Sequence, residues 1–193
     1  MWARNVWAPV TIALLIINVL VFVVGYLTEN AIIKLALVPV YLIDDPAMFA
    51  VSSLISMFLH SGVVHIAFNM LALFTIGRIL EPHIGSAKFI SVYILSGFAG
   101  AGLHTAYAFI SQSGIYTPVV GASGAISGII GISAALGDRV AIFWLIAQIP
   151  LAFSGFSSIA WFAHIGGFVF GFISGRIMLY MHRKKERYDG YYV

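Results

Sequence analysis

The feature that most constrains this chain is a series of long apolar runs separated by short polar segments. A helix needs roughly 20 apolar residues to cross the hydrocarbon core of a bilayer. Of the 193 residues, 61% are hydrophobic and only 9% are charged, whereas soluble domains carry about 25% charged residues. The sequence therefore predicts an all-α polytopic membrane protein. Its expected spans are 8–27, 63–80, 89–110, 121–136, 140–153 and 159–181.

The expected spans differ in length, and the segments between them differ in character. The runs 121–136 and 140–153 are too short for a straight crossing, so we expect them to be buried by neighbouring helices, to start below the membrane surface, or both. The segment 48–59 is too apolar for a solvated loop, which favours a position in the outer interface or a re-entrant path. We expect one membrane-embedded domain over 1–193 that ends in a short basic tail at 182–193.

The basic residues predict the orientation of the chain. Six spans place both termini on one side, and of the ten Lys and Arg residues only Lys34 falls on the other side. The positive-inside rule then makes both termini cytoplasmic. The excess of basic residues that gives the net charge of +3 is explained by this orientation and by attraction to anionic lipid headgroups. It therefore does not indicate a nucleic-acid partner. The basic residues on the terminal side are Arg4, Arg78, Lys88, Arg139, Arg176, Arg183, Lys184, Lys185 and Arg187.

Polar side chains inside three of the spans indicate a functional site, because such groups are costly in lipid. His65 and Asn69 share a helix face, Ser123 lies in the fourth span and His164 in the sixth. At 1.5 Å per residue, Asn69 and His164 lie roughly 18 Å and Ser123 roughly 22 Å from the charged inner boundary. Three helices therefore bring these groups to one level, about 8–12 Å below the outer surface. We expect the site to open to the outer face.

Glycines surround the serine and follow the histidine at helical spacing. In the stretch GASGAISG, two glycines lie on one helix face, and two more follow His164 at i+3 and i+7. Small residues let two membrane helices approach closely. We expect these glycines to bring the fourth and sixth spans together. The glycines expected to support the site are Gly121, Gly124, Gly128, Gly167 and Gly171.

The residue types predict a particular chemistry. A serine hydroxyl becomes a strong nucleophile when a neighbouring base takes its proton, and His164 is the base available to Ser123. The amide of Ser123 at a helix start, with His65 and Asn69 opposite, can donate hydrogen bonds to a developing oxyanion. No carboxylate lies at this depth. The site is therefore predicted to be a Ser–His dyad, with no metal and no cofactor.

Four features in this order resemble the rhomboid family of intramembrane serine proteases. They are HSGVVHIAFN at His60–Asn69, an acidic residue at Glu81, GASG at Gly121–Gly124 and AHIGGFVFG at Ala163–Gly171. The resemblance covers nearly the whole chain and implies a six-transmembrane-helix rhomboid-like bundle. It also implies an endopeptidase that cleaves single-pass transmembrane proteins within or beside their membrane helix.

The resemblance also assigns roles to the residues. It implies that Ser123 is the nucleophile, that His164 is the general base, and that His65, Asn69 and the Ser123 amide form the oxyanion hole. His60 and Glu81 would brace the outer loop and the inner end of the second span.

The sequence departs from the family pattern at two places. Many members carry an aromatic residue four positions after the nucleophile, where this chain has Ser127, and a Trp-Arg pair where residues 49–54 read FAVSSL. The loop before the sixth span, 150–158, would be a mobile cap over the site.

Other readings of these residues remain open at this level. One alternative is a family relative that has the same fold but no catalytic activity and that only binds membrane helices. Another is a transporter that uses the buried polar groups as a path for its substrate. The sequence shows no inverted repeat and no buried acid that would support a transporter. Metal ligation by His60, His65 and His164 would lack a buried carboxylate base. His104 is expected to be a packing or hydrogen-bonding residue of the third span.

Overall fold

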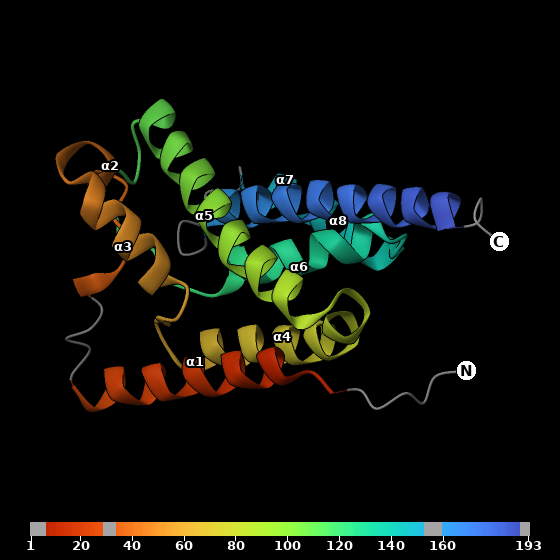
Figure 1. Cartoon of the computed structure of the whole chain (residues 1–193). Coiled ribbons are helices and arrows are strands. Elements are labelled where there is room, and N and C mark those ends of the chain that lie inside the picture. Colours follow the sequence, from red (N-terminus) through yellow and green to blue (C-terminus); the bar gives the residue numbers. More distant parts are fainter. Residues whose placement is uncertain (1–6, 29–33, 153–159, 190–193) are drawn as a thin grey trace.

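The structure, a computed structural model, describes residues 7–28, 34–152 and 160–189. Within these ranges the chain consists of helices joined by loops and turns, and the β pairing among them is an isolated antiparallel bridge between Leu37 and Val119. Figure 1 shows that α1 begins and α8 ends at the same end of the bundle, whereas α2 and α3 lie at the opposite end. The helices are α1 (Pro9–Leu27), α2 (Tyr41–Asp44), α3 (Pro46–Ser56), α4 (Val63–Ile84), α5 (Ser86–Ser111), α6 (Ser123–Ala135), α7 (Arg139–Ala152) and α8 (Trp161–Asp189).

The helices confirm an all-α membrane protein with several apolar spans. Among the described residues, four helices are long and apolar enough to cross a membrane, namely α1, α4, α5 and α8. The fourth and fifth predicted runs became α6, with 13 residues, and α7, with 14 residues. Neither reaches the length of a full crossing, so the number of six spans stays a prediction.

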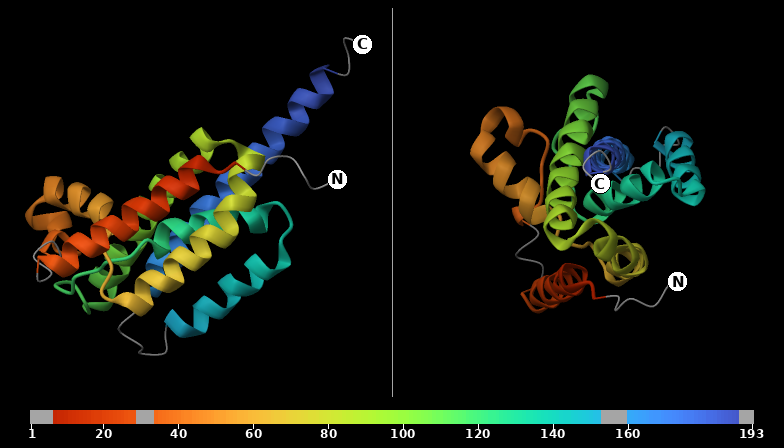
Figure 2. Two further views of the ribbon diagram at one scale, coloured as in Figure 1. Left: turned by 90° about the horizontal axis from the view of Figure 1, so that it is seen from below. Right: turned by 45° about the vertical axis from the view of Figure 1, so that its right-hand side comes forward.

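The shortest of the helices formed from the predicted spans, α6, is enclosed by other helices on several sides. The helix α6 contacts α4, α5, α7 and α8, and almost all of its residues are buried. Packing within the bundle is tightest among α5, α6 and α8, while α1 packs mainly against α4 (Figure 2). Enclosure on several sides allows α6 to be short, because a buried helix need not match the thickness of the lipid.

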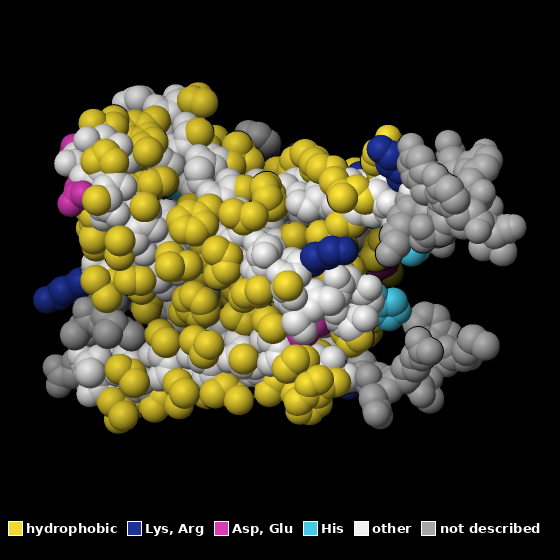
Figure 3. Space-filling model, in the orientation of Figure 1, with side chains coloured by type: hydrophobic (Ala, Val, Ile, Leu, Met, Phe, Trp, Pro, Cys, Tyr) yellow, Lys and Arg dark blue, Asp and Glu magenta, His cyan; other side chains and the backbone are white. Residues whose placement is uncertain are grey.

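The outer surface of the bundle has the character expected of a lipid-facing wall. Hydrophobic side chains cover most of the face in Figure 3, and charged side chains gather mostly toward the two ends. Large apolar residues such as Ile16 and Leu20 on α1 and Leu71 on α4 are more than half exposed. A soluble protein rarely exposes so many large apolar side chains together.

The apolar segment after the first span folds as a helix. The helix α3 begins after Asp45, whose carboxylate accepts a hydrogen bond from the Met48 amide (2.9 Å) and so caps the helix. Ser52, Ser53 and Ser56 lie on its buried face, and α3 contacts α5. The structure shows that most of the segment 48–59 is helical, whereas its expected position in the outer interface or on a re-entrant path stays a prediction.

The last helix is longer than the sequence analysis expected. We predicted a span ending at 181 followed by a short basic tail, and α8 continues to Asp189. The part of the tail at 182–189 is therefore helical, because Lys, Arg and Glu are good helix formers and nothing in that stretch breaks the helix. The rest of the tail, residues 190–193, lies outside the described residues.

A buried carboxylate joins the first span to the second. Glu81, near the end of α4, accepts hydrogen bonds from the amides of Val10 (3.0 Å) and Thr11 (2.7 Å) and from the hydroxyls of Thr11 and Ser86 (both 2.7 Å). The two amides belong to the first turn of α1, where they have no acceptor within the helix. Glu81 thus caps α1 with a charge that suits the positive end of the helix dipole.

We expect the Glu81→Gln variant to be less stable by about 1–3 kcal/mol, because it loses the charge and one acceptor oxygen while the donors stay buried. The thermal unfolding midpoint in detergent micelles measures this change. Asp44→Asn is the matched control, since it also neutralises a carboxylate but at an exposed position. Equal midpoints for the two variants would contradict the role given to Glu81.

Candidate active site

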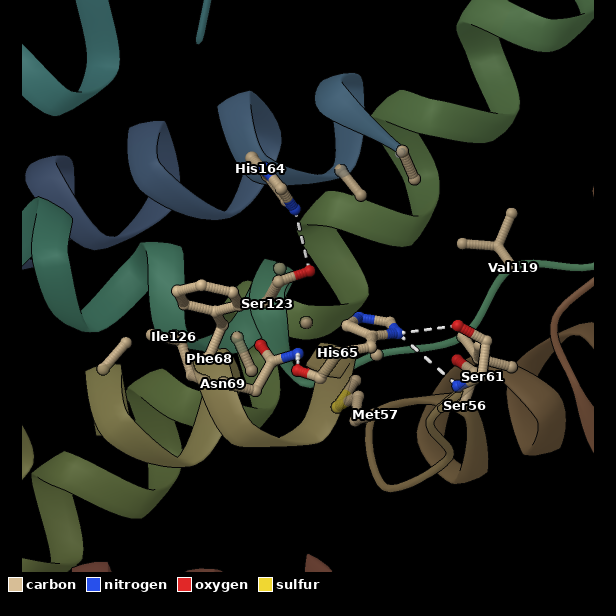
Figure 4. A pocket seen from close by; sticks show the side chains of 18 of the residues that line it. Ser56, Met57, Ser61, His65, Phe68, Asn69, Val119, Ser123, Ile126 and His164 are labelled. Atoms are coloured by element: carbon tan, nitrogen blue, oxygen red, sulfur yellow. Dashed lines mark hydrogen bonds between the residues drawn. The ribbon is translucent and has the colours of Figure 1, made fainter. Parts of the chain in front are cut away.

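The serine and histidine predicted to react lie in contact. Ser123 is the first residue of α6, and His164 lies in the first turn of α8. The Nε2 atom of His164 is 2.8 Å from the Oγ atom of Ser123, within hydrogen-bond distance (Figure 4). Ser123 is half-buried and His164 is buried. The structure therefore brings together two groups that are 41 residues apart in the chain.

The turn before Ser123 is held in place from two directions. Val119 and Leu37 exchange backbone hydrogen bonds of 2.7 and 3.2 Å, and the amide of Gly121 donates to the carbonyl of Ser56 (2.9 Å). Gly121 has a φ of +132°, a conformation that side chains with a Cβ rarely adopt. These contacts place the start of α6, and with it Ser123, against the end of α3 and the segment before α2.

The contact between α6 and α8 depends on glycine. A Cβ atom added at Gly167 would fall on the carbonyl oxygen of Gly124, and one added at Gly171 would fall on that of Gly128. At Gly124 itself an added Cβ would only reach an ordinary contact, 3.5 Å from the carbonyl oxygen of Ala163. A Cβ added at Gly131 of α6 would fall on the carbonyl oxygen of Phe168, so the close approach relies on Gly167 and Gly171 of α8 and on Gly131 of α6.

Two polar side chains of α4 face the same space as Ser123 (Figure 4). His65 contacts Ser61 through Nδ1 (3.1 Å to Oγ), and its Nε2 points toward Gly121, where an added Cβ would lie only 2.8 Å away. The side-chain amide of Asn69 donates to the carbonyl of His65 (3.0 Å). An amide nitrogen carries two hydrogens, so Asn69 has a second donor for a ligand in the cavity.

His60 and Glu81 lie away from the reacting pair. His60 is buried between α3 and α4, with its ring edge-to-face with that of His65 at 5.1 Å. Burial and, to a smaller extent, the nearby His65 lower the pKa of His60 to about 4, so this histidine is neutral at pH 7. Glu81 binds the start of α1 at the other end of α4. Within the described residues, no three His, Asp or Glu side chains are grouped as a metal site requires.

A cavity of about 800 Å³ opens at the Ser123–His164 pair. It is bounded by α3, α4, α5, α6, α7 and α8, and its lining is mostly apolar with a few hydroxyl, amide and imidazole groups. Val64 and Phe68 of α4, which line it, are about 70% exposed, so this wall faces the surroundings of the bundle. The cavity is large enough for several residues of an extended peptide.

Sequence reasoning missed the aromatic surroundings of His164. Trp144 of α7 lies with its ring 5.9 Å from the imidazole at an angle of 34°, and Trp161 of α8 lies 5.6 Å away at 82°. The i, i+3 spacing of Trp161 and His164 could have indicated that contact. No spacing signal links Trp144 to His164, because they belong to different helices.

Two further sequence expectations concern the neighbourhood of the site. The hydroxyl of Ser127 donates to the carbonyl of Ser123 (2.6 Å), a hydrogen bond within α6. The start of the expected cap at 150–158 belongs instead to α7, which ends at Ala152. The remainder of that cap lies outside the described residues.

Comparison with known proteins shows the family. The model of the Rhomboid domain matches residues 50–181, which include all the residues of the candidate site. The chain therefore belongs to the rhomboid family.

Three curated relatives illustrate the similarity. RHOMBOID-like protein 4 of Arabidopsis thaliana is 35% identical over 135 residues, which are 63% of this chain and 32% of that protein. Rhomboid protease AarA of Providencia stuartii is 48% identical over 85 residues, 39% of this chain and 30% of its own length. Rhomboid protease GluP of Bacillus subtilis is 35% identical over 129 residues, 60% of this chain and 24% of its own length. The chain spans about a third or less of the length of these relatives.

Proposed function

We propose that this chain is an intramembrane serine endopeptidase that cleaves single-pass membrane proteins within or beside their transmembrane helix. The observation that carries the proposal is the 2.8 Å contact between Ser123 Oγ and His164 Nε2 at a cavity inside an apolar bundle. Membership of the rhomboid family supports it, as do relatives that are named rhomboid proteases.

The contact suggests how the reaction proceeds. His164 Nε2 accepts the hydroxyl proton while Ser123 Oγ attacks the carbonyl carbon of the substrate peptide. The proton then passes to the leaving amide nitrogen as the peptide bond breaks, leaving an acyl-enzyme on Ser123. Water, deprotonated by the same imidazole, attacks the ester carbonyl. The imidazolium then returns the proton to Ser123 Oγ as the acyl C–O bond breaks and the second product leaves with a free carboxyl group. The dyad requires no metal or cofactor for these steps.

Donors for the oxyanion come from two helices. Ser123 is the first residue of α6, so its amide has no acceptor within the helix and lies at the positive end of the helix dipole. Asn69 supplies its second amide hydrogen and His65 its ring from α4. Preorganised donors of this kind stabilise the tetrahedral intermediate most where water is excluded.

The proposal includes the arrangement of the chain in the bilayer. The described helices fit a single membrane-embedded domain in which α6 and α7 are the fourth and fifth of six spans. Both termini lie in the cytoplasm, since the basic residues favour that side, and the site opens toward the outer face. The apolar wall formed by Val64 and Phe68 suits the lateral approach of a substrate helix from lipid.

Covalent labelling tests the proposal. A biotinylated fluorophosphonate should form an adduct with the wild-type protein in liposomes, and mass spectrometry of the labelled peptide should place the adduct on Ser123. Ser123→Ala should not be labelled. Ser127→Ala is the matched control, since it removes a hydroxyl one turn away on the same helix, and should be labelled like wild type.

Two results would contradict the proposal. An adduct on another residue would move the nucleophile elsewhere. A wild-type protein that is neither labelled nor able to cleave several single-pass substrates would instead support a rhomboid relative that binds membrane helices without cutting them.

A further inference from the structure

The imidazole of His164 is flanked by indole rings from two helices. We propose that Trp144 of α7 is a positioning residue that holds the imidazole of His164 with Nε2 directed at Ser123. The proposal rests on the proposed function for its kinetic consequence. Its structural content, that Trp144 restrains this ring, can be measured separately.

The hydrogen bond to Ser123 fixes the position of Nε2, but one such bond does not by itself fix the plane of the imidazole ring. Trp161 precedes His164 by one turn on α8 and touches the ring edge-on, at 82°. Trp144 approaches the imidazole from a separate helix, with its ring tilted by 34° to it. Neighbouring rings from two helices limit how far the imidazole can turn.

Trp144 is itself anchored to α8. Its indole stacks on Phe168 with ring centroids 6.2 Å apart and an angle of 17°. Phe168 lies four residues after His164 and is buried. The indole of Trp144 therefore lies against side chains from two successive turns of α8. This packing holds the indole in a fixed position relative to the backbone that carries His164.

The residue that the family pattern would place against the histidine does not take this role. Many rhomboid relatives have an aromatic side chain where this chain has Ser127, and the Ser127 hydroxyl is directed at the carbonyl of Ser123 within α6. The indole of Trp144 supplies an aromatic surface from α7 instead. The face of an indole also attracts the imidazolium that forms when His164 takes the serine proton, since the centroids are 5.9 Å apart.

If Trp144 instead obstructed access of the substrate to Ser123, its substitution would have the opposite effect on the kinetics of cleavage. The side chain is half-buried and lines the cavity, so it could act only as an obstacle between the substrate and Ser123. Removal of an obstacle would raise the cleavage rate or lower KM. Removal of a positioning residue lowers kcat and leaves KM almost unchanged, because ground-state binding is retained.

Kinetics of three variants in proteoliposomes distinguish these roles. Trp144→Ala should reduce kcat by about 5- to 20-fold, the range expected for the loss of an aromatic contact and a cation–π interaction, with KM within about twofold of wild type. Trp144→Phe, which keeps an aromatic face, should restore most of kcat. Phe143→Ala is the matched control, since its side chain is 72% exposed on the same helix. An unchanged or higher kcat in Trp144→Ala overturns the proposal.

Nuclear magnetic resonance tests the restraint without relying on activity. In protein labelled with ¹³C at the histidine ring Cε1, the His164 signal is assigned from its absence in His164→Ala. Trp144→Ala should shift and broaden this signal by removing the ring current and the restraint, whereas Phe143→Ala should leave it in place. An unmoved signal overturns the proposal, even if the enzyme cleaves. A shifted and broadened signal in a protein that does not cleave would support the restraint while the proposed function fails.

Discussion

Replacement of His164 by alanine is expected to lower the kcat for cleavage of a single-pass substrate by about 10³- to 10⁴-fold, because Ser123 then has no base to take its proton. Ser123→Ala should lose as much, since no acyl-enzyme can form. The double variant should be no slower than either single variant, because the two residues act as one unit. KM should change little in all three, as the cavity lining is otherwise retained. Initial rates of cleavage in liposomes measure these effects.

The controls for this experiment separate the dyad from unrelated causes. His83→Ala removes an exposed imidazole near the end of α4, and should cleave at the wild-type rate. Addition of EDTA should have no effect on wild type. Residual cleavage of more than a few per cent by Ser123→Ala or His164→Ala would mean that another group, or a contaminating protease, carries the activity.

The location of the candidate site could be predicted because polar groups are rare in lipid. Ser123, His164 and Asn69 interrupt apolar runs, and the helical rise places them at one level relative to the charged boundary. The structure brings Ser123 and His164 into contact and places Asn69 on the wall of the same cavity. The number of residues between each polar group and the charged boundary is enough to predict that these groups lie at one level, since the helices of a membrane bundle run roughly parallel to one another.

The lateral arrangement of the helices could not be predicted in this way. Trp144 lies in an apolar run, where a tryptophan gives no sign of a special role. Its indole comes close to His164 only through the packing of α7 against α8. The extension of α8 to Asp189 was missed for a related reason. Charge marks where the bilayer ends, and a helix does not have to end there.

Replacement of Gly171 by alanine is expected to destabilise the protein by about 3 kcal/mol, which corresponds to a thermal midpoint lower by about 6–12 °C. The added Cβ would fall on the carbonyl oxygen of Gly128 and lie 2.6 Å from its Cα. These are backbone atoms, which cannot rotate away, so α6 and α8 must move apart. The midpoint can be measured by thermal unfolding in detergent micelles.

The same substitution should also slow catalysis, because the helix contact that it opens is the one that positions the dyad. Ser123 lies on α6 before Gly128, and His164 lies on α8 before Gly171, so separation at the glycines extends toward the 2.8 Å contact. A displacement of about 1 Å can reduce kcat about 10²-fold. Gly102→Ala is the matched control: Gly102 lies within α5, and an added Cβ there has nothing within 4 Å. Its midpoint should stay equal or rise, since alanine favours a helix more than glycine does. If both alanine variants unfolded at the wild-type midpoint and cleaved at the wild-type rate, close glycine packing would not be what holds Ser123 and His164 together.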